Sequence, residues 1–378
     1  MSENKPIGGK IITKPFIVLA LVVAIAGILI IKRFIFGIGA VSNLSDGYPW
    51  GIWIAYDVVA GTAIACGGYA MALLVYVFNK GEYHPLVRPA LMASMFGYTL
   101  AGLSIMVDIG RYWQAYNLFL PWHTNLNSIM FEVAFCVSLY IFILWMEFSP
   151  TFAEWLQAKG LKKMLDRIMF VFIAIGLLLP TMHQSSLGTL MVIAGKKLSP
   201  LWQTGFLPLL FLISAIAMGF AIVIFESLLS SVGFKRELET PILGKIAAII
   251  PQLLGLYLII RFGDLVFRGA LGQIFSFDFK SLMFIIENVL YVISMIMLLS
   301  AANRKSAQKL FVAAVSLLLA GSVYRFNAII IGFDPGQGWQ YFPSFSELMI
   351  TFGVISVEIL AYLIFVKKLP VLPHVKHA

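Results

Sequence analysis

Ten long apolar stretches constrain this sequence more than any other feature, because each is long enough to cross a lipid bilayer. A membrane-spanning helix needs about 20 mostly apolar residues. Of the 378 residues only 12% are charged, whereas roughly 25% are charged in soluble domains. We therefore predict an all-α polytopic membrane protein, a single membrane domain over residues 1–378, with spans at residues 16–35, 50–78, 86–111, 128–147, 162–183, 204–230, 242–267, 281–302, 308–331 and 346–368.

The distribution of lysine and arginine predicts how the chain crosses the membrane. Most of the 27 Lys and Arg residues fall in the termini and in the loops on the side of the termini. Cytoplasmic loops carry such an excess. We therefore expect a multi-pass protein of a bacterial inner membrane with both termini cytoplasmic and an uncleaved first span. The net charge of +9 then follows from topology and requires no nucleic acid partner.

A weak internal repeat suggests that two halves of the chain share an architecture. One copy runs from Asp108 to Glu132 and the other from Arg261 to Glu287, each with an acid–base pair, a loop and a second acid. Such repeats recur in membrane transport and redox proteins. We predict two four-helix bundles, residues 50–183 and 204–331, flanked by single helices at 16–35 and 346–368.

Ionisable side chains inside the predicted spans are the candidate functional residues. An ionised group at the bilayer centre costs at least about 2.5–3.5 kcal/mol, so each requires a partner or a function. Most of these groups fall in the outer third of the predicted spans. They are Asp57, Asp108, Arg111, Glu132, His183, Glu226, Arg261, Asp264, Glu287, Arg325 and Glu358.

Spacing along the predicted helices separates structural from functional candidates. The members of the pairs Asp108–Arg111 and Arg261–Asp264 are three residues apart, a spacing at which they can bond to each other. Asp57 and Glu132 have no basic partner on their own helix. We interpret these two acids as groups that exchange protons with a ligand.

The remaining candidates have alternative readings. Tyr98 is either a packing residue or part of a proton path, and Glu226 either reaches water at the inner interface or carries protons. Arg325 is expected to bridge helices. His183 follows Pro180 in the run LPTMHQSSLGTLM, which predicts a kinked, polar helix end at the outer boundary.

Histidine and cysteine placement indicates no metal centre within the chain. A membrane b-type haem needs axial ligands, usually two histidines on facing helices, and none of the five histidines lies in the middle of a predicted span. Cys66 and Cys136 lie in apolar runs, and two thiols do not make the usual four-cysteine set of an iron–sulfur cluster. Any redox centre should therefore belong to a partner or a diffusible cofactor.

Tryptophans gather at the predicted outer face. An interfacial aromatic belt is one explanation, and a surface for a flat ligand or a docked protein is another. The six tryptophans at or near this face are Trp50, Trp53, Trp113, Trp122, Trp202 and Trp339.

Several longer motifs carry a family resemblance. They are GGKIITKP, YPWGIWIAYDVVAGTAIACGG, HPLVRPALMASMFGYTLAGLSIMVDIGRYW, LPTMHQSSLGTLM and PGQGWQYFPSFSELMIT. Together they resemble the NrfD/polysulfide-reductase-type membrane subunits, and within them those of hydrogenase-2-type nickel–iron hydrogenases. The resemblance implies a subunit without haem or iron–sulfur cluster, which passes electrons from a periplasmic ferredoxin-like iron–sulfur protein, and so from hydrogenase small and large subunits, to menaquinone or ubiquinone.

The same resemblance implies roles for individual residues. Quinone binding is expected at Asp57, Arg111, His123 and Glu132. Proton transfer is expected at Tyr98, Glu132, His183 and Glu226. Structural or secondary roles are expected for Asp108, Arg261, Asp264, Glu287, Arg325 and Glu358.

Two functions of other classes fit the residues as well. Buried carboxylates in two bundles also describe a proton-coupled secondary transporter, which would need no periplasmic redox partner. A purely structural anchor, with quinone reduced elsewhere in a complex, is the other alternative. Co-purification of a redox partner distinguishes the transporter, and substitution of Glu132 distinguishes the anchor.

Overall fold

The computed structural model describes residues 5–372, and within that range it contains helices and no strand. Ten helices are long and apolar enough to cross a membrane, one for each predicted span. These helices confirm the predicted all-α polytopic class. They cover Lys14–Phe36, Trp53–Val77, Gly81–Asp108, Ile129–Trp155, Lys159–Ile193, Leu207–Gly233, Thr240–Phe267, Phe279–Leu299, Ala307–Ile331 and Phe345–Lys368.

The chain forms two compact units, each of which combines separate stretches of sequence. The first contains the described residues up to Thr62, Leu91–Leu179 and those from Pro335 onward, and the second contains Ala63–Ala90 and Pro180–Asp334. Span 2 and the fifth span each contribute to both units. The grouping of spans 2–5 and 6–9 into two bundles stays a prediction.

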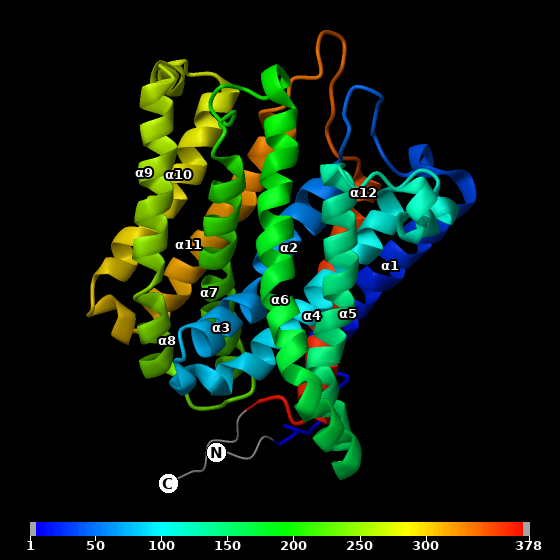
Figure 1. Ribbon diagram of the computed structural model, residues 1–378, viewed down its shortest axis with the longest axis vertical. Helices are drawn as coiled ribbons and strands as arrows, with labels where there is room; N and C mark the ends of the chain where they lie inside the picture. Colours follow the sequence, from blue (N-terminus) through cyan, green and yellow to red (C-terminus); the bar gives the residue numbers. More distant parts are fainter. Residues whose placement is uncertain (1–4, 373–378) are drawn as a thin grey trace. The chain divides into compact units, whose positions relative to one another are not determined.

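In the first unit, α1 (Lys14–Phe36) packs along α12 (Phe345–Lys368), and Figure 1 shows these two helices side by side. Thr13 begins α1 by accepting a hydrogen bond from Phe16 N on Oγ1 at 3.4 Å. A Cβ at Gly353 would overlap Ala26. Small residues at such contacts let membrane helices approach closely, so this pair sets the distance between α1 and α12.

Three further helices supply the rest of the first unit. They are α4 (His84–Asp108), α5 (Ile129–Trp155) and α6 (Lys159–Ile193), of which His84–Ala90 and Pro180–Ile193 belong to the second unit. Ser128 begins α5 by accepting a hydrogen bond from Phe131 N. This cap fixes the start of α5 at Ile129, three residues before Glu132.

The second span is irregular. It runs through η2 (Trp53–Ala60), α2 (Gly61–Ile64), α3 (Gly67–Ala72) and η3 (Leu73–Val77), and both η2 and η3 are π-helical. π-helical turns are rare in proteins, and many of those that occur lie at functional sites. The wide turn of η2 carries Asp57.

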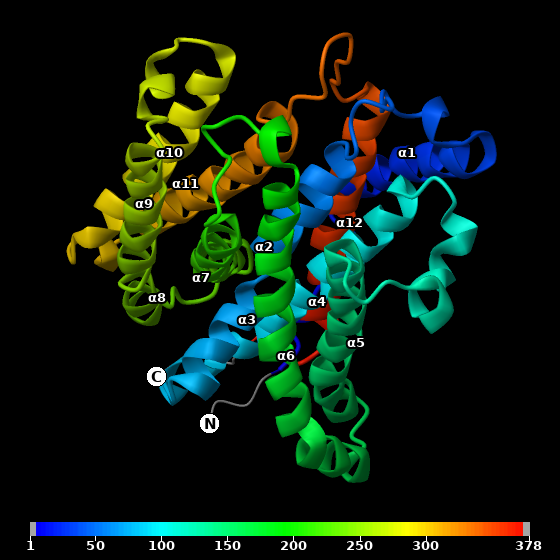
Figure 2. The same ribbon diagram turned by 45° about the horizontal axis from the view of Figure 1, so that its top comes forward.

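In the second unit, four helices pack around one core: α7 (Leu207–Gly233), α9 (Ile250–Phe267), α10 (Phe279–Leu299) and α11 (Ala307–Phe326). Figure 2 shows them together, with the short α8 (Thr240–Ala247) leading into α9. The α3 segment packs on α7, where a Cβ at Gly219 would lie 2.5 Å from Cys66 O.

The start of α10 shows how a single side chain fixes a helix end. Asp278 Oδ1 accepts a hydrogen bond from Ser281 N at 2.7 Å. This bond to the charged form lowers the pKa of the Asp278 carboxyl. Asp278 therefore caps α10 as a carboxylate, nine residues before the buried Glu287.

The predicted end of the fifth span is wrong. We expected a loop over 184–203, but α6 continues to Ile193. The polar residues after Pro180 bond within the helix: Ser185 Oγ donates to Thr181 O at 2.8 Å, and Thr189 Oγ1 donates to Ser185 O at 3.1 Å. Because these hydroxyls are satisfied inside the helix, a polar sequence here does not mark a loop.

The six outer tryptophans, expected to form an interfacial belt or a surface for a ligand or docked protein, do not all lie at the surface. Trp113, Trp122 and Trp339 are exposed, but Trp53 and Trp202 are fully buried. The indole N–H of Trp53 donates to Glu347 O at 3.3 Å. A buried tryptophan needs such an acceptor, and these two rings therefore stabilise the protein interior.

Candidate functional site

Asp57 lies in the first unit on η2, with its carboxyl held between helices. Its side chain is 6% exposed. Oδ2 accepts hydrogen bonds from Ser104 Oγ on α4 at 3.2 Å and from Thr351 Oγ1 on α12 at 3.3 Å. No donor within residues 5–372 reaches Oδ1. Since buried polar atoms are nearly always hydrogen-bonded, Oδ1 is the atom of this carboxyl available to a ligand or water.

Two other residues predicted to bind quinone lie in the exposed connection between α4 and α5. Arg111 precedes η5 (Tyr112–Phe119), and His123 ends η6 (Pro121–His123). Both side chains are exposed. In the described part of the chain, no hydrogen bond or ion pair joins either of them to Asp57. Their place in a common pocket stays a prediction.

Glu132 and Tyr98 lie deeper in the first unit. Glu132 is in the first turn of α5 and is half-buried. Tyr98 on α4 is fully buried, and its ring meets that of Tyr140 on α5 edge-on at 4.6 Å between centroids. Tyr98 therefore has the packing role that the sequence allowed, and its phenol remains a candidate for proton transfer.

The predicted pairing of Asp108 with Arg111 is wrong. Among the described residues no ion pair joins them, and the cation near Asp108 is Arg33 of α1, which is 1% exposed. Arg33 Nε donates to Val107 O at 2.6 Å, and Arg33 Nη2 donates to Ile109 O. A cation favours the carbonyl end of a helix. Arg33, in the last turn of α1, thus stabilises the end of α4.

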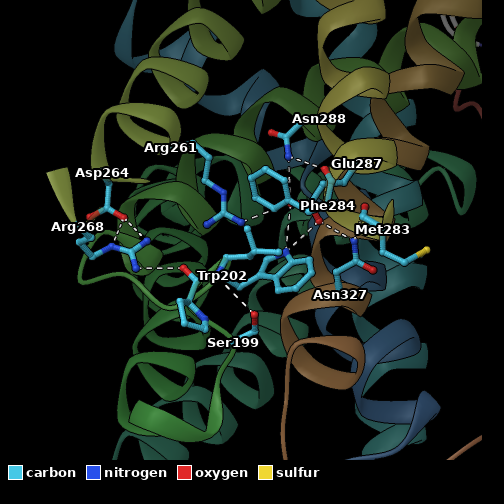
Figure 3. Close-up of polar contacts among 12 residues, drawn as sticks. Ser199, Trp202, Arg261, Asp264, Arg268, Met283, Phe284, Glu287, Asn288 and Asn327 are labelled. Atoms are coloured by element: carbon cyan, nitrogen blue, oxygen red, sulfur yellow. Dashed lines mark hydrogen bonds and ion pairs between the residues drawn. The ribbon is translucent and has the colours of Figure 1, made fainter. Parts of the chain in front are cut away.

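The most extensive buried polar cluster lies in the second unit around Glu287 of α10 (Figure 3). Its carboxylate accepts from Trp202 Nε1 at 3.1 and 3.2 Å, from Asn327 Nδ2 at 2.7 Å and from Asn288 Nδ2 at 3.4 Å. Arg261 Nη2 of α9 forms an ion pair with it at 3.4 Å. Glu287 is therefore a fully hydrogen-bonded carboxylate that ties α9, α10 and the segment after α11 together.

This cluster overturns the predicted pairing of Arg261 with Asp264. Arg261 turns inward to Glu287, and its guanidinium also lies 5.0 Å from the centroid of the Phe284 ring. Asp264 pairs with Arg268 instead, at 2.7 Å. Arg261 and Asp264 therefore lie on the same helix but bond to different partners, one on α10 and one at the end of α9.

Arg325 is the second buried cation of this unit. It is 0% exposed, and its guanidinium bridges three helices. It donates to Phe211 O of α7 at 3.1 Å, to Gln184 Oε1 of α6 at 3.4 Å and to Gly321 O of its own helix at 3.3 Å. These bonds satisfy most of the guanidinium without a carboxylate.

Two predicted acids are less buried. Glu226 lies on α7, seven residues before its end at Gly233, and is half-buried. Glu358 lies near the middle of α12 and is also half-buried. The roles of both acids stay predictions.

Sequence reasoning missed two acids. Glu347, in the first turn of α12, is fully buried and accepts from Tyr341 Oη at 2.6 Å and from Asn43 N at 2.9 Å. Burial, and then this hydrogen bond, raise the pKa of the Tyr341 phenol. The pattern Ser344-x-x-Glu347 is a capping box, a signal that could have revealed it.

Glu147 of α5 is the second acid that the sequence did not single out. Its Oε1 atom is buried against Gly176 of α6, where any Cβ would collide with it. No donor in the described residues reaches this oxygen. Glycine at 176 opens the notch that holds the carboxyl, a pairing of residues far apart in sequence that no local pattern shows.

His183, expected at the outer end of its span, lies further inside the helix than predicted. It is fully buried in α6, ten residues or about 15 Å before the helix ends. His84 and His123 are exposed, while His374 and His377 lie outside the described residues. The described histidines thus do not supply the two buried axial ligands of a bis-histidine haem, and no group of three or more His, Cys, Asp or Glu among residues 5–372 suits a metal ion.

Comparison with known proteins identifies the family. Residues 40–334 match the family described as Polysulphide reductase, NrfD. The chain is 46% identical to the Probable Ni/Fe-hydrogenase 2 b-type cytochrome subunit of Escherichia coli K12, over 99% of this chain and 96% of that protein. It is 32% identical to a protein of Nitratidesulfovibrio vulgaris Hildenborough, over 96% of this chain and 94% of the other.

A further relative carries a quinone in its name. The menaquinone reductase integral membrane subunit of the same Nitratidesulfovibrio strain is 26% identical, over 89% of this chain and 86% of that protein. The family match covers most of the chain, and these relatives extend along nearly all of it. The chain belongs to the NrfD family of polysulphide-reductase-type membrane subunits.

Proposed function

We propose that this chain is the membrane subunit of a periplasm-facing respiratory hydrogenase. It takes electrons from a periplasmic ferredoxin-like iron–sulfur subunit, supplied by nickel–iron hydrogenase small and large subunits, and delivers them to menaquinone or ubiquinone. The hydrogenase-2 name of the E. coli relative supports the donor, and the menaquinone reductase relative supports the acceptor.

The proposed setting is the bacterial inner membrane with both termini cytoplasmic. The excess of Lys and Arg in the loops on the side of the termini supports this orientation. Near the two ends of the described chain, Ile7 N donates to Val366 O at 3.2 Å and Gly8 N donates to Lys367 O at 3.1 Å. These bonds bring both ends to the same end of α12, as ten crossings require.

The proposal that quinone binds here rests mainly on the Asp57 carboxyl, of which one oxygen is hydrogen-bonded and the other is not. Oδ2 is held by two hydroxyls, whereas Oδ1 is buried and has no donor within residues 5–372. A protonated Asp57 therefore presents its O–H to a ligand in a fixed direction. A quinone carbonyl oxygen is an acceptor of matching chemistry, and its reduction to a hydroxyl consumes the proton that Asp57 supplies.

The chemistry requires two electrons and two protons for each quinone converted to quinol. The electrons come from the iron–sulfur partner. Asp57 and Glu132 are the proposed proton donors at the quinone oxygens, and Arg111 and His123 stabilise negative charge that develops there. Each acid must then regain its proton, so a path that supplies protons to both acids is required.

The proposed proton path uses Tyr98, Glu132, His183 and Glu226. If the protons come from the cytoplasm, each turnover moves charge across the membrane, and one charge across 100 mV is worth about 2.3 kcal/mol. Glu226 is the member nearest the predicted cytoplasmic end of its helix, seven residues before Gly233. It is therefore the proposed entry point.

In the Glu226→Gln variant, we expect hydrogen-dependent quinone reduction to continue close to the wild-type rate while the membrane potential it generates is lost. The amide cannot release a proton, so protons reach the quinone only from the other side. Membrane vesicles with a potential-sensitive dye measure both quantities, and the exposed Glu237→Gln is the matched control. Full coupling in Glu226→Gln would remove this residue from the path.

The wild-type arm of that experiment tests the proposed function itself. Vesicles that carry the assembled complex are expected to reduce quinone with hydrogen. An assembled complex without this activity, or a chain that purifies with no redox partner, contradicts the proposal and favours the transporter or anchor alternatives.

The name of the E. coli relative includes a b-type cytochrome, but the described histidines of this chain do not fit a bis-histidine haem. His183 is the one buried histidine among those described, and its Nε2 lies 3.1 Å from Gln184 Nε2. A haem iron there would need a second axial ligand that the other described histidines do not provide. We therefore route no step of the proposed reaction through a haem.

A further inference from the structure

Arg325, Gln184 and His183 form a chain of hydrogen-bonding side chains in the second unit. Arg325 Nη2 lies 3.4 Å from Gln184 Oε1, and Gln184 Nε2 lies 3.1 Å from His183 Nε2. All three side chains are fully buried. Buried chains of this kind fix the direction of every hydrogen bond in them, because an unmatched donor or acceptor is costly.

The orientation of Arg325 is set independently of Gln184. Its Nη2 donates to Phe211 O at 3.1 Å, and its Nη1 contacts Met218 Sδ and Gly321 O, each at 3.3 Å. The guanidinium also lies 5.2 Å from the centroid of the Phe211 ring. A guanidinium only donates hydrogen bonds and stays charged. Arg325 is thus a fixed donor that faces Gln184.

This donor determines which way the Gln184 amide points. The atom that faces Arg325 has to be the carbonyl oxygen, since an NH₂ group there would oppose donor to donor. The amide nitrogen then faces His183 and donates to it. Nε2 of His183 must therefore be the unprotonated acceptor, and a neutral ring carries its proton on Nδ1.

We propose that Arg325 and Gln184 are positioning residues that hold His183 neutral with its proton on Nδ1. Nε2 of His183 then accepts a proton only when its hydrogen bond from the Gln184 amide breaks. A proton on Nε2 would meet the amide N–H, and the nearby guanidinium opposes a second positive charge. This inference rests on the proposed role of His183 in proton transfer.

The segment that carries His183 and Gln184 is firmly placed. Thr181 Oγ1 lies 2.6 Å from Tyr69 Oη, and a Cβ at Gly188 would lie 2.5 Å from Leu207 O at the start of α7. These contacts keep the end of α6 against the helix that holds Arg325. Titratable groups near Arg325 include Cys66, Tyr257, Tyr291 and Tyr324. The ion pair of Arg261 with Glu287 acts on the same three tyrosines.

The pH profile of hydrogen-dependent quinone reduction tests the inference in membranes that carry the whole complex. In Gln184→Glu, the carboxylate accepts from both Arg325 and a protonated Nε2, so the imidazolium is favoured. We expect the alkaline pH at which the rate is half-maximal to rise by about one unit or more. The exposed Gln252→Glu adds the same charge to the same unit and is expected to leave the profile unchanged.

Gln184→Met keeps the test decisive if the added charge prevents assembly. Methionine is similar in size and removes the donor that opposes Nε2–H, so the half-maximal pH is expected to rise by a smaller amount. Unshifted profiles in both assembled variants overturn the inference.

His183→Gln separates this inference from the proposed function. Loss of the pH transition in His183→Gln, with no shift in the Gln184 variants, overturns the positioning role alone. A wild-type rate and profile in His183→Gln remove His183 from the proton path, and the inference falls with it. Absence of quinone reduction in the wild type overturns the proposed function instead.

Discussion

Asp57→Asn is expected to lower hydrogen-dependent quinone reduction by about a hundredfold or more, the usual contribution of a positioned proton donor. Asparagine keeps an oxygen for Ser104 and Thr351, which hold Oδ2 in the native protein. Its second polar group is an amide that cannot deliver a proton. The side chain should therefore remain in place while the chemistry at Oδ1 is lost.

The measurement compares two electron acceptors in the same membranes. Hydrogen-dependent reduction of a soluble dye by the hydrogenase subunits is expected to stay at the wild-type rate in Asp57→Asn, because that reaction needs no quinone site. Asp46→Asn, an exposed change in the same unit, is the matched control. Normal quinone reduction in an assembled Asp57→Asn complex would reduce this residue to a packing role.

Glu287→Leu is expected to cause the largest loss of stability of any single change in the second unit. The substitution leaves Arg261 buried without a counter-ion and removes the acceptor of Trp202 and Asn327. Breaking a buried ion pair by removing one partner typically costs about 3–5 kcal/mol. The subunit should then be nearly absent from membranes, or lose its folded state at a much lower temperature.

A double variant separates the ion pair from the rest of the cluster. Replacing Arg261 by Met together with Glu287→Leu removes both charges, and replacement of a buried pair by apolar residues is often neutral. We expect the double variant to restore much of the lost amount of subunit in the membrane, measured by immunoblot, and much of its thermal stability, measured by denaturation in detergent. Glu82→Gln, in the exposed pair with Lys245, should change little. A stable Glu287→Leu single variant contradicts this account of the cluster.

The ten spans could be predicted because bilayer thickness sets a length that apolar composition reveals directly. The end of α6 could not, because the residues after His183 look like a loop. In the structure Ser185 and Thr189 bond back to α6 carbonyls. A polar helical segment whose side chains bond to carbonyls of the same helix has the same composition as a loop.

Pairing partners were the least predictable part of the site. Arg261 has an acid three residues away, yet it bonds to Glu287, 26 residues on. Helical spacing shows which residues can meet on one helix, but not which face of that helix is buried. Likewise, Arg33 lies near the end of the first predicted span, and no local pattern shows that it donates to the carbonyls of Val107 and Ile109 at the end of α4.

Glu147 and Glu347 show a second limit. Each owes its burial to distant residues, Gly176 for the first and Tyr341 with Asn43 for the second. Asp57 was identified from the sequence because it has no basic partner on its own helix. Its contacts with Ser104 and Thr351 join three separate segments, which only the folded chain brings together.

Photolabelling with an azidoquinone tests the central claim, that quinone binds within this chain, most directly. The labelled complex, with hydrogen present or absent, is digested and its peptides are identified by mass spectrometry. The account predicts label on peptides that contain η2 or the first turn of α5, and loss of that label with excess menaquinone. Label confined to partner subunits, or to the peptides of α9, α10 and α11, would contradict it.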